Sequence, residues 1–175
     1  MALSDATTER LQLSRWDPAL HTPALEAINA VPEAVRYLNA GVPYTPAETS
    51  AQSARFAAHW ERFGFGLWAV TVTAIVETVG FVGLSHPLWF PELADEVEVG
   101  WRLHPRAWGR GYATEAGQAA LAAAPTLGLA RIIAVIDPGN TASIAVATRL
   151  GLCHEQTRPH PQRHGDVFVY ALRFP

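Results

Sequence analysis

The chain has 175 residues, 49% of them hydrophobic, and a formal net charge of −3. A chain of this length buries about 70% of the surface that it exposes when unfolded, so it can build one core without cross-links. Its single cysteine, Cys153, excludes an internal disulfide and cysteine-rich zinc or iron–sulfur sites. No block of basic residues is present, and we expect no nucleic-acid partner.

All 13 basic residues are arginine, and lysine is absent. This excludes Schiff-base and pyridoxal-phosphate enzymes and Walker A nucleotide sites, since each requires a lysine amine. The segment Met1 to Arg10 has no apolar core of a signal peptide, and no apolar run approaches the ~20 residues that span a bilayer. We therefore expect a cytoplasmic protein with no membrane partner.

The N-terminal part of the chain predicts a strand followed by helices. Glu9 to Trp16 alternates as an edge strand does. Asp17-Pro18 supplies an N-cap and a proline at the first helical position, so a helix or pair of helices is expected to about Leu38. Thr45 caps a second helix, which we expect to end near Gly64-Phe65-Gly66.

Strand signals dominate the middle of the chain. Leu67 to Thr73 and Glu77 to Leu84 are rich in β-branched and aromatic residues and are separated by a short connection, which predicts an antiparallel hairpin or meander. His86 to Asp95 predicts a loop with exposed aromatic side chains. Val97 to Leu103 is again a predicted strand, ended by Pro105, which cannot donate to a ladder.

A glycine-containing turn then leads into a helix predicted over Tyr112 to Ala124. The first main-chain N–H groups of such a helix, together with those of the turn, form an anion site. Gly109 and Gly111 allow a phosphate to approach the main chain and permit positive φ, and Arg106 and Arg110 add charge. An ordinary tight turn with surface arginines is the alternative interpretation.

Two well-known phosphate loops do not fit this turn. A dinucleotide fingerprint requires glycine where Thr114 stands, and a Walker loop requires lysine. The segment Glu98 to Leu103 followed by Trp108 to Glu115 instead resembles the acetyl-CoA motif of GNAT N-acetyltransferases, with the RimJ/RimL branch as the most similar group.

A second signature of that family follows in the expected order. Asn140 to Val146 and Arg149 to Leu152 resemble it, after a predicted strand at Arg131 to Ile136. The resemblance extends more weakly from Glu9 to a final predicted strand at Asp166 to Arg173. It implies one acetyltransferase domain over residues 1–175.

The fold class that the resemblance implies is α/β (α+β). The GNAT fold has a central mixed, mostly antiparallel twisted sheet of six to seven strands flanked by about four helices. Its fourth and fifth strands splay apart, and a bulge near Gly100 would help them to do so.

The resemblance implies acetyl-CoA as co-substrate and no metal. Main-chain groups of the central strand would pair with the pantetheine amides, and the glycine turn would hold the pyrophosphate. The residues implied in binding are Trp101, Arg102, Leu103, Arg106, Trp108, Gly109, Arg110, Gly111, Tyr112, Ala113, Thr114, Asn140 and Ser143.

Two side chains are candidates for the chemistry. Glu98 is the candidate base for the attacking amine, although a solvated or ion-paired strand residue is an equally good interpretation. Ser143 matches the position of a hydroxyl that protonates the departing thiolate, and Asn140 would bridge pantetheine and helix. The alternatives are an N-cap for Asn140 and an ordinary first-turn serine for Ser143.

The implied acceptor is an amine, either a protein N-terminus or a small molecule. An α-amine with a pKa of about 8 loses about 1.4 kcal/mol in becoming neutral at pH ~7, against about 4.6 kcal/mol for a lysine amine, so it demands less of a base. A non-catalytic acyl-CoA-binding or sensor domain of the same fold is the alternative function. Either a monomer or a homodimer is expected.

Two further groups of side chains have weaker interpretations. Four aromatic residues are candidates to line the acceptor site, and packing is equally plausible for them: Tyr37, Tyr44, Trp89 and Phe90. Cys153, His154, His160 and His164 invite a metal hypothesis, which their spacing does not favour.

Overall fold

The structure is a computed structural model that describes residues 3–174. Met1, Ala2 and Pro175, which the predicted domain includes, lie outside the described residues. The strands are β1 (Ala6–Thr7), β2 (Leu11–Arg15), β3 (Leu67–Val72), β4 (Glu77–Ser85), β5 (Glu98–Leu103), β6 (Arg131–Ile136), β7 (Cys153–Pro159) and β8 (Asp166–Arg173). The helices are α1 (Pro18–Asn29), α2 (Pro32–Val35), α3 (Pro46–Phe63), α4 (Tyr112–Ala123) and α5 (Thr141–Arg149).

All of these strands lie in one mixed sheet in the order β1-β2-β3-β4-β5-β6-β8-β7. Neighbouring strands are antiparallel except β5 and β6, which are parallel. The predicted fold class is confirmed, with eight strands and five α-helices in residues 3–174. The strands for which the sequence yields no prediction are the two-residue β1 and the proline-containing β7.

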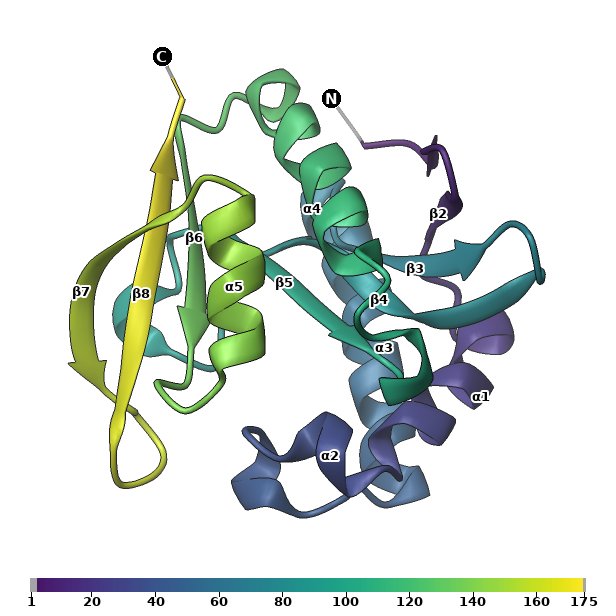
Figure 1. The fold of residues 1–175 in the computed structure, drawn as a ribbon, viewed down its shortest axis with the longest axis horizontal. Helices are drawn as coiled ribbons and strands as arrows, with labels where there is room; N and C mark the ends of the chain where they lie inside the picture. The colour runs from purple at the N-terminus through teal and green to yellow at the C-terminus, as the bar shows by residue number, and fades with distance from the viewer. Residues whose placement is uncertain (1–2, 175) are drawn as a thin grey trace.

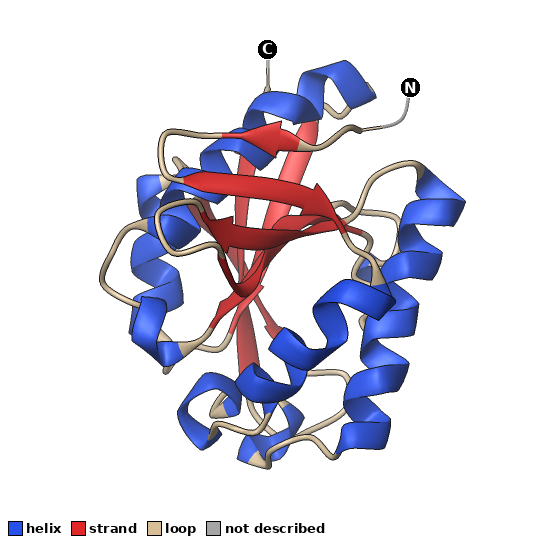
Figure 2. Ribbon diagram, turned by 90° about the vertical axis from the view of Figure 1, so that its right-hand side faces the viewer, coloured by secondary structure: helices blue, strands red, loops and turns tan. Residues whose placement is uncertain are grey.

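Helices cover both faces of this sheet (Figure 2). Figure 1 shows α4 and α5 in front of the sheet and α3 behind it, where α3 packs against α1. The core between these layers includes Trp60 and Trp68, which are almost completely buried. No helix in residues 3–174 is long and apolar enough to cross a bilayer.

The predicted helix starts are confirmed. The Asp17 side chain accepts a hydrogen bond from Ala19 N at 2.8 Å, and Thr45 forms a reciprocal capping box with Glu48. The first helical region divides into α1 and α2 because Pro32 has no N–H with which to continue α1.

The first predicted strand is shorter than expected, and it is not the edge of the sheet. β2 begins at Leu11, because Glu9 and Arg10 form the turn that leads from β1 into β2. The two residues of β1 cover the outer edge of β2. The predicted hairpin of β3 and β4 is confirmed.

The loop between β4 and β5 is only partly as predicted. Trp89 is 38% exposed, but Phe90 is buried against Ile133 and Val169, so the prediction of exposure is wrong for Phe90. Phe90 is the N-cap residue of a 3-10 turn, Pro91–Leu93.

The predicted bulge near Gly100 is also wrong. The β4–β5 register runs without a shift from Gly80 opposite Leu103 to Ser85 opposite Glu98. The sheet opens where the ladder between β5 and β6 stops, at Glu98 and Ile133. This opening does not require the extra residue that a bulge would insert into β5.

Glu115 connects α4 to the turn between β1 and β2. Its carboxylate accepts hydrogen bonds from the Thr8 hydroxyl at 2.5 Å and from Arg10 N at 2.9 Å, and it forms an ion pair with the Arg10 guanidinium at 2.6 Å. Burial would raise the pKa of Glu115, but the bonds from Thr8 and Arg10 and the charge of Arg10 together hold it below its usual value.

We predict that Glu115→Gln lowers the free energy of unfolding by about 2 kcal/mol at neutral pH, because hydrogen bonds to a charged acceptor become bonds to a neutral one. A depressed carboxyl pKa stabilises the fold above the unfolded-state pKa, and this stabilisation is lost as pH falls through the folded-state pKa. Urea unfolding at neutral and acidic pH measures both effects. A difference between wild type and variant that does not shrink on acidification would contradict the assignment.

Candidate functional site

Strands β5 and β6 share a single bridge, between Glu98 and Ile133. At that point Ile133 N donates to Val97 O at 2.9 Å. Beyond it the two strands diverge, as Figure 1 shows, and no further bridge joins them in the described part of the chain. The splay predicted between the fourth and fifth strands lies between β5 and β6, because the two-residue β1 adds one strand before them, and it begins at Glu98.

The diverging edge of β5 carries main-chain groups without ladder partners. His104 N donates to Val79 O across the β4–β5 ladder at 2.8 Å. Because main-chain groups alternate between the two edges of an antiparallel strand, those of Trp101 and Leu103 face away from β4. Both residues follow Glu98, so β6 does not pair with them. The structure thus places these two predicted residues where an extended ligand can bind as a strand does.

The Glu98 side chain lies at the point of divergence. Its Oε1 accepts a hydrogen bond from Val135 N at 3.2 Å. Burial raises the pKa of Glu98 to about 7, against the opposing effects of the Val135 N–H and the Trp89 side chain. A carboxyl group with this pKa is poised to exchange protons near neutral pH.

Main-chain donors are exposed at the start of α4. Gly109 and Gly111 have φ of 69° and 80°, and Gly111 caps α4 without a side-chain hydrogen bond. A Cβ built on Gly109 would meet no atom within 4 Å, so a ligand can approach this main chain closely. The predicted residues Tyr112, Ala113 and Thr114 form the first turn of α4, where the helix dipole favours an anion.

The arginines of this turn differ in their partners. Arg106 forms an ion pair with Glu77, whereas Arg110 has no carboxylate partner in residues 3–174. The Arg10 guanidinium stabilises the turn by donating a hydrogen bond to Arg110 O at 2.9 Å. The sequence does not reveal this role of Arg10, because the contact joins segments 100 residues apart.

Asn140, Ser143 and Trp101 form one hydrogen-bonded group. The Asn140 side chain accepts from Ser143 N at 3.1 Å, so Asn140 is the N-cap of α5. The Trp101 indole donates to Ser143 Oγ at 3.2 Å. Since that bond uses the oxygen as an acceptor, the hydroxyl proton of Ser143 is free to be donated elsewhere. The sequence does not predict this use of Trp101.

Trp108 and Arg102 differ from their expected roles. The Trp108 indole donates to Leu103 O at 2.8 Å, so this carbonyl already has one partner. The Arg102 side chain does not reach the glycine turn. It bonds to Asn29 and Gln52 of α1 and α3, on the face of the sheet that these helices cover.

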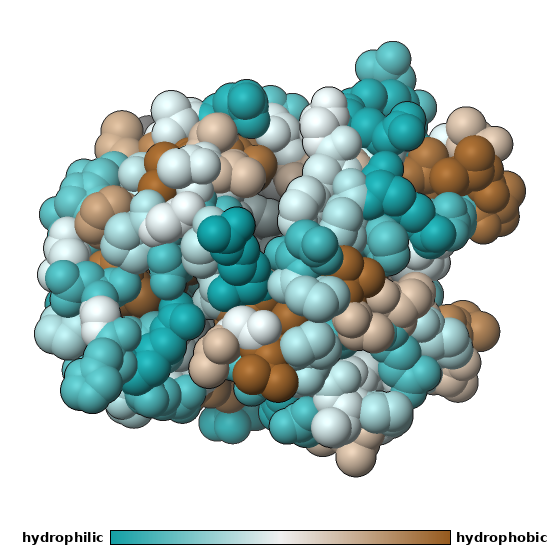
Figure 3. All heavy atoms as spheres, turned by 60° about the horizontal axis from the view of Figure 1, so that its bottom comes forward, coloured by the Kyte–Doolittle hydropathy of each residue, from teal (hydrophilic) through white to brown (hydrophobic). Residues whose placement is uncertain are grey.

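Two segments far apart in the sequence meet near α5. Arg163, in the turn between β7 and β8, donates to Tyr37 O at 3.1 Å and pairs with Asp137 at 2.9 Å. The Tyr37 ring also packs on Gly139. This end of the molecule is turned forward in Figure 3, where hydrophobic patches are separated by hydrophilic surface. Of the four predicted aromatic residues, Phe90 alone is buried in the core.

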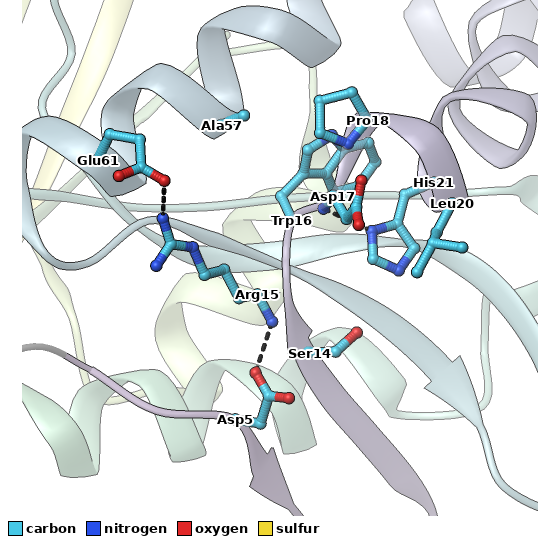
Figure 4. Close-up of a pocket in the computed structure, with 10 residues that line it drawn as sticks. All are labelled: Asp5, Ser14, Arg15, Trp16, Asp17, Pro18, Leu20, His21, Ala57 and Glu61. Carbon is cyan, nitrogen blue, oxygen red and sulfur yellow. Dashed lines mark hydrogen bonds and ion pairs between the residues drawn. The ribbon is translucent and has the colours of Figure 1, made fainter.

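Two other features do not form part of this site. No three metal-ligating side chains cluster in residues 3–174. A cavity of about 540 Å³ between β2, α1 and α3, shown in Figure 4, contains none of the predicted site residues. Its charged groups already have partners, with Arg15 paired to Glu61 and the Asp5 side chain bound to Arg15 N.

Comparisons with known proteins show which family and which folds this chain resembles. Residues 10–152 match the family model described as "Acetyltransferase (GNAT) domain". The uncharacterized protein YkkB of Bacillus subtilis (strain 168) is 32% identical over 99 residues, which are 54% of this chain and 55% of that protein, so the chain matches about half the length of this relative.

Two solved structures share the fold over nearly the whole chain. An acetyltransferase from Agrobacterium tumefaciens str. C58 is 30% identical, with a TM-score of 0.82 over 99% of this chain and 96% of that one. The ribosomal L7/L12 alpha-N-protein acetyltransferase RimL, in complex with coenzyme A, is 20% identical, with a TM-score of 0.78 over 96% of each chain.

Proposed function

The chain belongs to the GNAT acetyltransferase family, and we propose that it transfers the acetyl group of acetyl-CoA directly to a primary amine while both substrates are bound. Acetyl transfer follows from the family. The observation that carries the finer proposal is the open edge of β5, which ends at Glu98 and lies beside the α4 N-terminus. The amine is that of a protein N-terminus or of a small molecule.

The residues present fit acetyl-CoA. Trp101 offers an N–H and a C=O, and Leu103 an N–H, for the two pantetheine amides. The open space at Gly109 and the uncapped first turn of α4 fit the pyrophosphate. Arg110, which has no carboxylate partner in the described residues, adds charge. The domain extends over residues 1–175 in this proposal.

The reaction forms a bond between the amine nitrogen and the acetyl carbon and breaks the bond from that carbon to sulfur. Glu98 takes the proton that the amine loses, directly or through water, because its raised pKa makes it a stronger base than an exposed carboxylate. Ser143 donates its hydroxyl proton to the departing thiolate, with Trp101 holding the oxygen. A main-chain N–H of β5 stabilises the oxyanion.

The direct experiment measures release of free thiol from acetyl-CoA with and without a panel of primary amines. We expect amine-stimulated release that matches formation of the acetylated amine. Tight binding of acetyl-CoA with no stimulation by any amine would contradict catalysis and favour a sensor domain.

We predict that Glu98→Gln lowers kcat by about 10²- to 10⁴-fold, as expected for loss of a general base. Glutamine keeps an oxygen that accepts from Val135 N, so the end of the ladder is retained. Wild-type activity should rise with pH through about 7 as Glu98 ionises, and the variant should lack this rise. An acceptor amine that is already neutral at pH ~6 separates the effect from titration of the amine itself.

The pH dependence of folding stability provides a second test of the raised pKa of Glu98. Its pKa is raised from 4.5 to about 7 in the folded state, so the wild type should lose stability as pH increases between these values. Glu98→Gln should abolish that loss. Glu98→Ala, which also removes the partner of Val135 N, should unfold more readily than Glu98→Gln. Identical pH profiles of stability for wild type and Glu98→Gln would disprove the raised pKa.

We predict that Gly109→Ala weakens acetyl-CoA binding at least tenfold, because a methyl group would occupy the space next to the main-chain donors. Gly128→Ala is a matched control. Gly128 has φ of 73° against 69° for Gly109, and each has no atom within 4 Å of an added Cβ. Both variants should therefore lose about 1–2 kcal/mol of stability from left-handed strain. Isothermal titration with acetyl-CoA distinguishes them, and equal affinities would refute the phosphate site.

We predict that Ser143→Ala lowers kcat by about tenfold or more but changes acetyl-CoA affinity little, because the hydroxyl acts on the departing sulfur. Trp101→Phe keeps an aromatic ring and removes only the indole donor, so it should give a smaller decrease in kcat. Steady-state kinetics with direct binding measurements separates these effects. Equal losses in kcat and affinity for Ser143→Ala would count against its role as an acid.

A further inference from the structure

The guanidinium of Arg102 lies in the interior without a carboxylate beside it. Its Nη1 donates to Asn29 Oδ1 at 2.5 Å and approaches Gln52 Oε1 at 3.5 Å. The rings of Phe81 and Tyr44 lie 5.3 and 5.5 Å from the guanidinium carbon. Its Nε is buried with no hydrogen-bond partner. Amide oxygens and ring faces stabilise a cation, but they do not neutralise it.

Of the other three partly buried arginines in residues 3–174, two are neutralised, and the third, Arg158, donates to Gln156 Oε1 at 3.0 Å. Arg131 pairs with Glu96 and Glu155, and Arg163 pairs with Asp137 at 2.9 Å. Burial would lower the pKa of Arg131, but its bonds to these carboxylates raise it. Burial does lower the pKa of Arg102, and Tyr44 is the group that opposes this. Within residues 3–174, Arg102 takes part in no ion pair.

Two acidic side chains on the elements around Arg102 have partners elsewhere. Glu48, one turn before Gln52 on α3, accepts hydrogen bonds from Thr45 N and the Thr45 hydroxyl at 2.7 and 2.8 Å. Glu98 precedes Arg102 by four residues, about 13 Å along the strand, and accepts from Val135 N. The positive charge of Arg102 is therefore left for a group from outside the chain.

Arg102 shares a face of β5 with the candidate base. Alternate residues of a strand point to the same side, so Glu98, Gly100 and Arg102 share one face. A Cβ built on Gly100 would meet only Leu67 Cδ2, at 3.9 Å. On this face, the strand between Glu98 and Arg102 thus carries no side chain and leaves room for the body of a ligand.

We propose that Arg102 binds an anionic group of the amine acceptor, a carboxylate or a phosphate. The planar guanidinium can donate to two oxygens of such a group at once. The proposal rests on the function above, with the reacting nitrogen at Glu98. The four-residue separation of Glu98 and Arg102 places the anion several bonds from that nitrogen, as in a peptide with an acidic side chain near its N-terminus.

The test compares C-terminally amidated dipeptides that differ in one charge. Alanyl-glutamate is compared with alanyl-glutamine, and alanyl-phosphoserine with alanyl-serine, so the two pairs distinguish carboxylate from phosphate. Thiol release gives kcat/KM for each. We expect the wild type to prefer at least one acidic member by about tenfold or more. Arg102→Gln should abolish the preference while retaining transfer to the neutral peptides, and Arg102→Lys should restore part of it.

Arg55→Gln is the matched control. Arg55 is an exposed arginine on α3, and its replacement removes the same charge without touching the site. This variant should keep the wild-type preference. Equal losses for acidic and neutral peptides in Arg102→Gln would show a structural role and overturn the proposal. An absence of preference in the wild type would overturn it as well.

A binding measurement separates failure of this proposal from failure of the proposed function. If no peptide is acetylated, thermal unfolding in the presence of CoA is measured with the N-acetylated glutamate, glutamine, phosphoserine and serine dipeptide amides. A larger stabilisation by at least one acidic peptide, present in the wild type and absent in Arg102→Gln, would support the anion site even without turnover. Equal stabilisation by acidic and neutral peptides would contradict it.

Discussion

The parallel pairing of β5 with β6 stops after one bridge, and a side chain takes the place of the next main-chain partner. In a continuing parallel ladder, Val135 N would donate to a carbonyl of β5. It donates instead to the Glu98 carboxylate. This bond gives Val135 N a partner, while the edge of β5 that faces away from β4 has no ladder partner beyond Glu98. The opening of the sheet and the position of the carboxylate therefore have the same cause.

An open ladder edge explains why the residues of the site come from so few elements. Main-chain N–H and C=O groups require partners when water is excluded, and a ligand with spaced amides supplies them. Trp101 contributes its main chain to this edge and its indole to Ser143. One strand therefore links the splay to the start of α5, and the glycine turn that follows β5 leads directly into α4. Ligand binding at this edge would also stabilise the fold, since the unfolded chain has no such edge.

Local chemistry made much of this predictable from the sequence. The caps at Asp17 and Thr45, the hairpin of β3 and β4, and the glycine turn before α4 depend on neighbouring residues, and the structure has them as expected. Two of the features that were missed are long-range. The support from Arg10 and the Glu98 bond to Val135 depend on which segments meet in the fold. The strand β7 is local, since it forms a hairpin with β8, and it was missed in a segment rich in proline and polar residues. The bulge at Gly100 was wrong because a ladder can end without an inserted residue.

The treatment of charge distinguishes structural arginines from Arg102. Arg10, Arg131 and Arg163 join distant segments, and each is paired with a carboxylate of the chain. A chain that neutralises these residues could have placed an acid beside Arg102 or used an uncharged residue there, and either would remove the cost of an uncompensated buried cation. Functional sites typically keep residues that lower the stability of the fold but contribute to ligand binding. Arg102 also shares its strand face with Glu98, so the unneutralised cation and the carboxyl with the raised pKa lie at opposite ends of one surface.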